Sequence, residues 1–132
     1  MNDRDRQPAA ALDTVLHLGI VALALSTAWI HFTLGGPRFT LNAAGFVVLA
    51  LALVAPIAIA RRHRWLLRIG LAGYAATTIV GWALEPAFYT TAYVAKAIEL
   101  GLIALLAIDF VHHDGNPIDR LRRGPRSSQP VR

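Results

Sequence analysis

Two long stretches of this chain carry almost no charge, and this constrains its fold more than any other feature. Residues 14–60 contain Arg38 as their only charged residue, and residues 69–108 contain only three charged residues. A water-soluble helical bundle needs a charged face on each of its helices. With 55% hydrophobic and only 16% charged residues, the chain is predicted to be an all-α integral membrane protein rather than a soluble domain.

Four apolar segments are long enough to cross a bilayer, which takes about 20 residues in a helix. These segments cover residues 12–34, 40–60, 66–84 and 90–111. Because the connections between them are short, neighbouring helices must run antiparallel. We therefore predict a four-span antiparallel transmembrane helical bundle over residues 12–111, a cytoplasmic segment over 1–11 and a basic, disordered cytoplasmic tail over 112–132.

The arginines predict how this bundle is oriented. Ten of them fall at the two termini and in the second connection, and an eleventh, Arg68, lies just inside the third span on the same side, whereas the first connection holds only Arg38. Positively charged residues stay on the cytoplasmic side, so both termini are predicted to be cytoplasmic, in the plasma membrane of a prokaryotic cell. The same arginines explain the formal net charge of +5. We expect them to contact lipid headgroups and expect no binding of nucleic acid.

A cleaved signal peptide is the main alternative interpretation of the first span. Ala24, Ser26 and Ala28 have the small-residue spacing of a cleavage site. Three aspartates near the start of the chain and the length of the apolar run argue against it.

Small residues and one proline suggest how the helices pack. Gly73, Thr77 and Gly81 are spaced four apart in the third span. Such a stripe lets two helices approach closely, and it is predicted to form a contact within the bundle or between subunits. Pro56 removes a backbone donor and is predicted to bend the second span near its cytoplasmic end.

Lys96 and Glu99 are the most distinctive polar residues, because they share one helix face inside the fourth span. Counted from the outer boundary, they lie about 9 Å and about 14 Å deep. A charge at that depth costs about 2.5–3.5 kcal/mol, so contact with lipid is excluded. Two interpretations remain open: an ion pair that fixes helix packing, or a site for transport or binding, since a buried lysine can lose its proton.

Other polar residues lie at matching depths and define a candidate intramembrane site. Tyr93 shares the arc of Lys96 and Glu99. Thr78 on the third span and both Ser26 and Thr27 on the first span are at a similar depth. His31 lies nearer the outer surface, as a hydrogen-bonded structural residue or a contact for a substrate or proton. These groups are predicted to line a shallow cavity open to the outside, although tyrosines and tryptophans here also fit an aromatic belt.

No sequence motif for catalysis or for a cofactor is present. The chain has no cysteine, and it lacks a phosphate-binding loop, a nucleophile elbow and a zinc motif. We therefore assign no catalytic residue, no metal ligand and no cofactor, and expect the protein not to be an enzyme. Asp109, on another face of the fourth span, is expected to pair with Arg68.

The run Ile30-His31-Phe32-Thr33-Leu34-Gly35 resembles an IHxxLG signature of small four-helix membrane proteins of prokaryotes. The similarity extends over roughly residues 15–111 and includes Leu41 to Gly45, Gly73 to Trp82 and Tyr93 to Glu99. The resemblance implies the same four-span topology and an acid–lysine pair in the last span. It implies no activity, because that family has none assigned.

Two functions are compatible with these features. The first is a non-enzymatic packing or accessory component that forms a homo-oligomer or joins a larger membrane complex. The second is a small transporter or proton-coupled carrier that uses Lys96 and Glu99.

Overall fold

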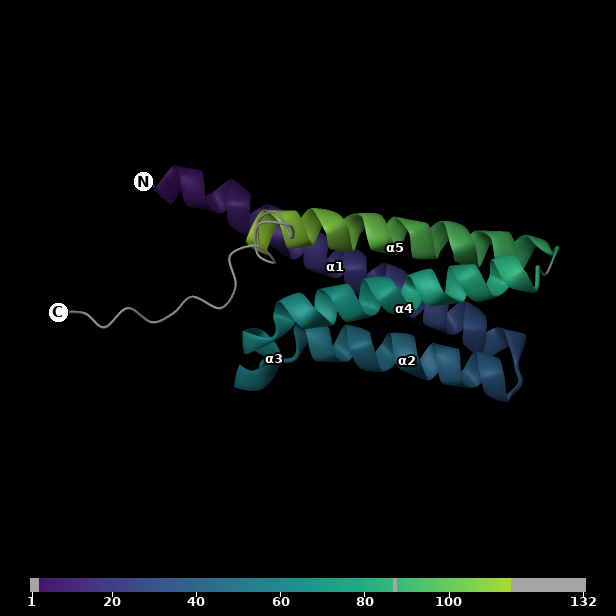
Figure 1. Cartoon of the computed structure of the whole chain (residues 1–132). Helices are drawn as coiled ribbons and strands as arrows, with labels where there is room; N and C mark the ends of the chain where they lie inside the picture. Colours follow the sequence, from purple (N-terminus) through teal and green to yellow (C-terminus); the bar gives the residue numbers. More distant parts are fainter. Residues whose placement is uncertain (1–2, 87, 115–132) are drawn as a thin grey trace, which may run out of the picture.

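The computed structural model describes residues 3–86 and 88–114, with only the backbone for residues 3–10 and 114. Within this part the protein has five helices and no strand, which confirms the predicted all-α fold (Figure 1). The helices are α1 (Asp3–Leu34), α2 (Pro37–Val54), α3 (Ala58–Arg62), α4 (Arg64–Leu84) and α5 (Thr90–Asp114). The predicted disordered tail lies outside the described residues from 115 onward.

The chain reverses between α1 and α2 within two glycines. Gly35 and Gly36 have φ angles of 71° and 83°, a region that is accessible to glycine but strained for other residues. Pro37 follows in the first turn of α2, where its missing N–H costs no helical hydrogen bond. This turn sets α2 antiparallel to α1.

The second apolar segment ends earlier than predicted. Its helix, α2, stops at Val54 rather than at residue 60, and Ala55 is extended with φ −56° and ψ 130°. A residue before proline is pushed out of the helical region by the proline ring, so Pro56 terminates the helix. The prediction that Pro56 bends a continuous helix is therefore wrong, and the chain resumes as the separate short helix α3.

The four long helices form a ring in which α1 and α4 each pack against α2 and α5 (Figure 1). We name each end of this bundle after an arginine that lies there. The Arg64 end holds α3 and the C-terminal end of α5, and the Arg38 end holds the α1–α2 and α4–α5 connections.

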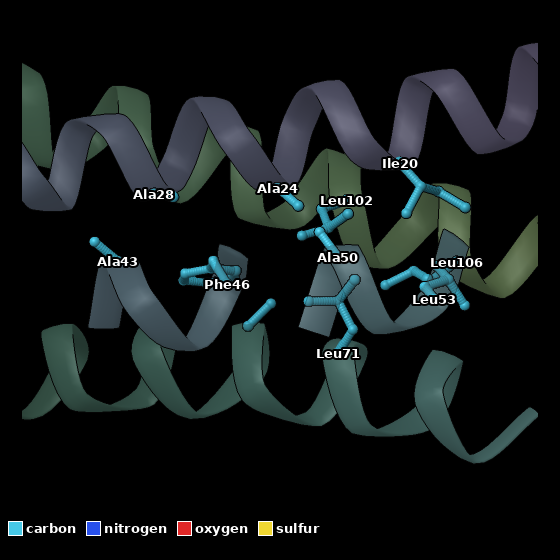
Figure 2. Packing of buried hydrophobic residues seen from close by; sticks show 11 residues of the cluster. Ile20, Ala24, Ala28, Ala43, Phe46, Ala50, Leu53, Leu71, Leu102 and Leu106 are labelled. Carbon is cyan, nitrogen blue, oxygen red and sulfur yellow. The ribbon is translucent and has the colours of Figure 1, made fainter. Parts of the chain in front are cut away.

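The core of the ring is apolar and contains many alanines. Figure 2 shows alanines of α1 facing alanines of α2, which allows these two backbones to approach closely. Larger side chains fill the remaining space toward the Arg64 end. The fully buried members are Ile20, Ala24, Phe46, Ala50, Leu53, Leu71, Ala75 and Leu102.

The outer surface is apolar as well. Large hydrophobic side chains are exposed on every long helix, among them Leu25, Val48, Leu51, Val80 and Leu100. A soluble monomer rarely exposes so continuous an apolar surface. Three helical segments are long and apolar enough to cross a membrane, namely Ala11–Leu34, Pro37–Val54 and Arg64–Leu84. The structure thus has the length and surface of a membrane protein.

The predicted packing stripe on α4 does not form a contact inside the chain. Gly73, Thr77 and Gly81 are exposed, and a Cβ atom built on either glycine would have no heavy atom within 4 Å among the described residues. Close approach occurs elsewhere, at Gly45 of α2. A Cβ atom there would lie 2.2 Å from the hydroxyl oxygen of Tyr74.

We predict that Gly45→Ala lowers the free energy of unfolding by about 1–3 kcal/mol. The measurement is the midpoint of thermal unfolding in detergent, which should fall. The new methyl group would displace Tyr74, whose hydroxyl donates to Asn42 and whose ring packs edge-on against Phe46 at 4.9 Å. Gly70→Ala is the matched control, because a Cβ atom there meets nothing within 4 Å. It should be neutral or stabilising, since alanine is the better helix former. Equal effects of both changes would contradict the packing described.

Candidate functional site

A carboxylate lies buried where three helices meet. Glu99 of α5 has no exposed surface, and its neighbours are Thr27 of α1, Thr78 of α4 and Lys96 of its own helix. Burying an unpaired carboxylate would cost far more than a hydrogen bond returns, so a buried acid needs several donors. Here the donors come from three different helices.

Both oxygens of Glu99 are occupied. Oε2 accepts from the ammonium of Lys96 at 2.6 Å and from the hydroxyl of Thr78 at 2.7 Å. Oε1 accepts from the hydroxyl of Thr27 at 3.1 Å. The ring nitrogen Nε2 of His31 also lies 3.7 Å from Oε1. The structure therefore places Lys96, Thr78 and His31 together around Glu99.

Lys96 lies between this buried carboxylate and a cavity. Its ammonium is 2.6 Å from Glu99 and 3.2 Å from the backbone carbonyl oxygen of Thr78, so two of its three N–H groups are used. The third N–H has no partner among the described residues, and Lys96 lines a cavity. An ammonium held in this way presents one hydrogen-bond donor to whatever enters.

His31 is held by its other ring nitrogen. Nδ1 lies 2.8 Å from the backbone carbonyl oxygen of Thr27, which can only accept, so Nδ1 carries a hydrogen. In the neutral ring Nε2 is then an unprotonated acceptor that faces the Glu99 carboxylate. If Nε2 binds a proton, the two groups become an ion pair. The ring is 4% exposed, and its Nε2 is held facing the Glu99 carboxylate.

The cavity has a volume of about 430 Å³ and lies toward the Arg38 end. One face of α4 forms its wall with residues spaced three or four apart, and α1, α2 and α5 close the other sides. Thr77 and Gly81 belong to this wall. The small residues that were predicted to pack against a helix instead leave this space open.

An ion pair lies at the mouth of the cavity. Arg38 at the start of α2 donates to Glu85, just after α4, at 3.1 Å. Both side chains are more than three-quarters exposed. Such a pair contributes little to stability, but it places both charges beside the opening.

Sequence reasoning erred at Tyr93 and left the choice between Thr27 and its neighbour Ser26 unresolved. Tyr93 is 49% exposed, does not line the cavity, and packs edge-on against Trp82 at 5.3 Å. Thr27 is fully buried against Glu99, whereas Ser26 is exposed and donates to the carbonyl of Ala22. The signal for Thr27 is its position four residues before His31, which puts both on one helix face.

A second polar cluster lies toward the Arg64 end. Arg68 of α4 and the fully buried Asp109 of α5 form the expected ion pair, with Nε and Oδ2 2.5 Å apart. His113 is 3.1 Å from Oδ1 of Asp109 and 3.4 Å from Asp13 of α1. No group of three or more histidine and acidic residues in the described part is arranged to hold a metal ion.

Comparison with known protein families, curated proteins and solved structures finds no match for this chain. The resemblance to small four-helix membrane proteins therefore stays a prediction.

We predict that Lys96→Met alone destabilises the protein by about 3–5 kcal/mol, because it leaves the Glu99 carboxylate buried without its cation. The double variant Lys96→Met with Glu99→Gln should recover most of that loss, since both charges are gone and the amide still accepts a hydrogen bond. The coupling between the two residues is measured in a double-mutant cycle, by thermal unfolding in detergent of the wild type, Lys96→Met, Glu99→Gln and the double variant. Additive effects would show that the pair is not coupled.

Proposed function

We propose that this protein crosses the plasma membrane four times, with α5 as the fourth span. The charges of α5 point into the bundle: Glu99 and Asp109 have no exposed surface and Lys96 is 9% exposed. Between Val94 and Val111 every exposed residue of α5 is apolar, including Leu100 and Ile108. A helix with this distribution presents hydrocarbon to lipid despite its charged residues.

The proposed orientation puts the Arg64 end in the cytoplasm. Arg61, Arg62 and Arg64 lie at that end, whereas Arg38 lies alone at the other. The positive-inside rule then places both termini in the cytoplasm. In this orientation the cavity opens toward the outside of the cell.

Single cysteines test the orientation, because the chain contains no native cysteine. Phe88→Cys and His63→Cys both change exposed residues, one near each end of the bundle. In intact cells a membrane-impermeant maleimide should label only the cysteine at 88, and both should react after the membrane is permeabilised. Labelling at 63 in intact cells would reverse the orientation.

For the function itself, we propose that the protein binds a small molecule in this cavity, as a small transporter or carrier. The supporting observation is that a cavity of about 430 Å³ with aromatic and aliphatic walls ends on a lysine held by a buried carboxylate. Sites for small molecules have this size and this combination of apolar walls with few fixed polar groups. We do not propose catalysis, since Glu99 is occupied by its own partners.

The second candidate is a packing or accessory component that oligomerises or joins a larger complex. It is favoured by the exposure of Gly73, which has nothing within 4 Å of its Cβ position among the described residues. This face of α4 would then meet a helix of another subunit. Cross-linking of single cysteines at Gly73 in native membranes distinguishes this role from that of a monomeric carrier.

We predict that Gly81→Leu abolishes binding in the cavity without loss of stability. Gly81 lines the cavity and no heavy atom lies within 4 Å of its Cβ position, so a leucine side chain would occupy the empty space. Ala83→Leu is the matched control, on the same helix and not among the lining residues. Small molecules extracted from the purified proteins and identified by mass spectrometry give the comparison. An identical set from both variants would exclude the cavity as the binding site.

A further inference from the structure

The charged groups around His31 cancel one another when the ring is neutral. On α5 it faces Glu99 and Lys96, which carry opposite charges 2.6 Å apart. Its neighbours on α2 are the uncharged rings of Phe39 and Phe46. The remaining ionisable groups lining the cavity are the Arg38–Glu85 pair at the mouth and the phenols of Tyr74 and Tyr89.

The polar groups still available in this cavity are mainly donors. Both oxygens of Glu99 are occupied, the carbonyl of Thr78 accepts from Lys96, and the side-chain oxygen of Asn42 accepts from Tyr74. Beside Glu99 and Tyr74, what remains is the third N–H of Lys96 and the amide N–H₂ of Asn42, with Nε2 of His31 as the acceptor already described; the Arg38–Glu85 pair and the hydroxyls of Thr77 and Tyr89 are the other polar groups of the lining. A ligand that satisfies these groups must bring oxygen acceptors, as a carboxylate does.

The rest of the lining selects for an apolar body. Leu34, Phe39, Trp82 and Ala95 surround the polar groups with aliphatic and aromatic surface. A short organic acid with an aromatic or aliphatic body fits both parts of the cavity.

A bound carboxylate would add a negative charge to a neutral, low-dielectric site, which is costly without compensation. His31 can supply the compensation, because its Nε2 faces Glu99 at 3.7 Å and becomes a cation by binding one proton. We propose that the cavity binds a small organic acid as its carboxylate, hydrogen-bonded to Lys96, together with one proton on His31. This proposal rests on the proposed binding function of the cavity.

The pH dependence follows by linkage. If the complex holds one more proton than the free protein and free benzoate together, binding tightens as the pH falls, by up to about tenfold per pH unit. Benzoate is a suitable probe, because it is ionised near neutral pH and small enough for the cavity. Benzamide is its uncharged counterpart and benzylamine its cationic one.

The experiment measures binding of radiolabelled benzoate to the full chain in phosphatidylcholine nanodiscs, between about pH 5.5 and about pH 7.5. We expect benzoate to bind the wild type more tightly than benzamide or benzylamine, with affinity rising as the pH falls. Lys96→Met with Glu99→Gln should lose most of the preference for benzoate over benzamide. His31→Asn keeps a donor for the Thr27 carbonyl but lacks the titrating nitrogen, so its benzoate affinity should lose the pH dependence.

The outcomes separate the two proposals. Equal benzoate binding by Gly81→Leu and wild type would exclude the cavity itself and so overturn the proposed function. Binding of benzamide or benzylamine in preference to benzoate, blocked by Gly81→Leu, would overturn only the ligand class. Full pH dependence retained in His31→Asn would show that the acid enters in its neutral form. Calorimetry of the wild type in buffers of different ionisation enthalpy counts the proton directly and needs no variant.

Discussion

The need to neutralise Glu99 away from water organises the half of this protein toward the Arg38 end. A buried carboxylate requires donors on all sides, and these come from α1, α4 and α5 at one depth. Because lipid provides little hydrophobic force between helices, such directional contacts determine how the helices are set relative to one another. The Arg68–Asp109 pair does the same for α4 and α5 toward the opposite end.

The two polar clusters are separated by a fully apolar layer. Ile20, Leu71, Leu102 and Leu106 belong to the buried apolar core (Figure 2), and each lies along its helix between a residue of one polar cluster and a residue of the other. Along α5, Glu99 and Asp109 are ten residues apart, about 15 Å of helix. Among the residues whose side chains are described, no chain of polar groups links the cavity with the Arg64 end. A proton or an acid bound at His31 and Lys96 is therefore held on one side of that layer.

Much of this architecture is encoded in the charge pattern. The uncharged stretches predict the long helices, and the spacing of Lys96 and Glu99 predicts their ion pair, because both features depend only on local geometry. Rotation of helices is harder to predict, since a helix surrounded by lipid is apolar on every side. For this reason the sequence does not distinguish Thr27 from Ser26, wrongly includes Tyr93 in the site, and does not reveal that Gly81 borders a cavity. Pro56 ends α2 six residues earlier than predicted, because a proline disfavours helical geometry at the residue before it.

One consequence concerns which part of the bundle is able to move. Among the described residues, α2 supplies no group to either buried ionic cluster, and its polar ties are the Asn42–Tyr74 hydrogen bond and the exposed Arg38–Glu85 pair. The other three long helices are joined at both levels, by threonine hydroxyls that donate to Glu99 at one level and by ion pairs of Asp109 and Asp13 at the other. α2 is therefore the long helix that can shift without breaking either buried cluster, and it is bounded by the Gly35–Gly36 turn at one end and the Ala55–Pro56 break at the other.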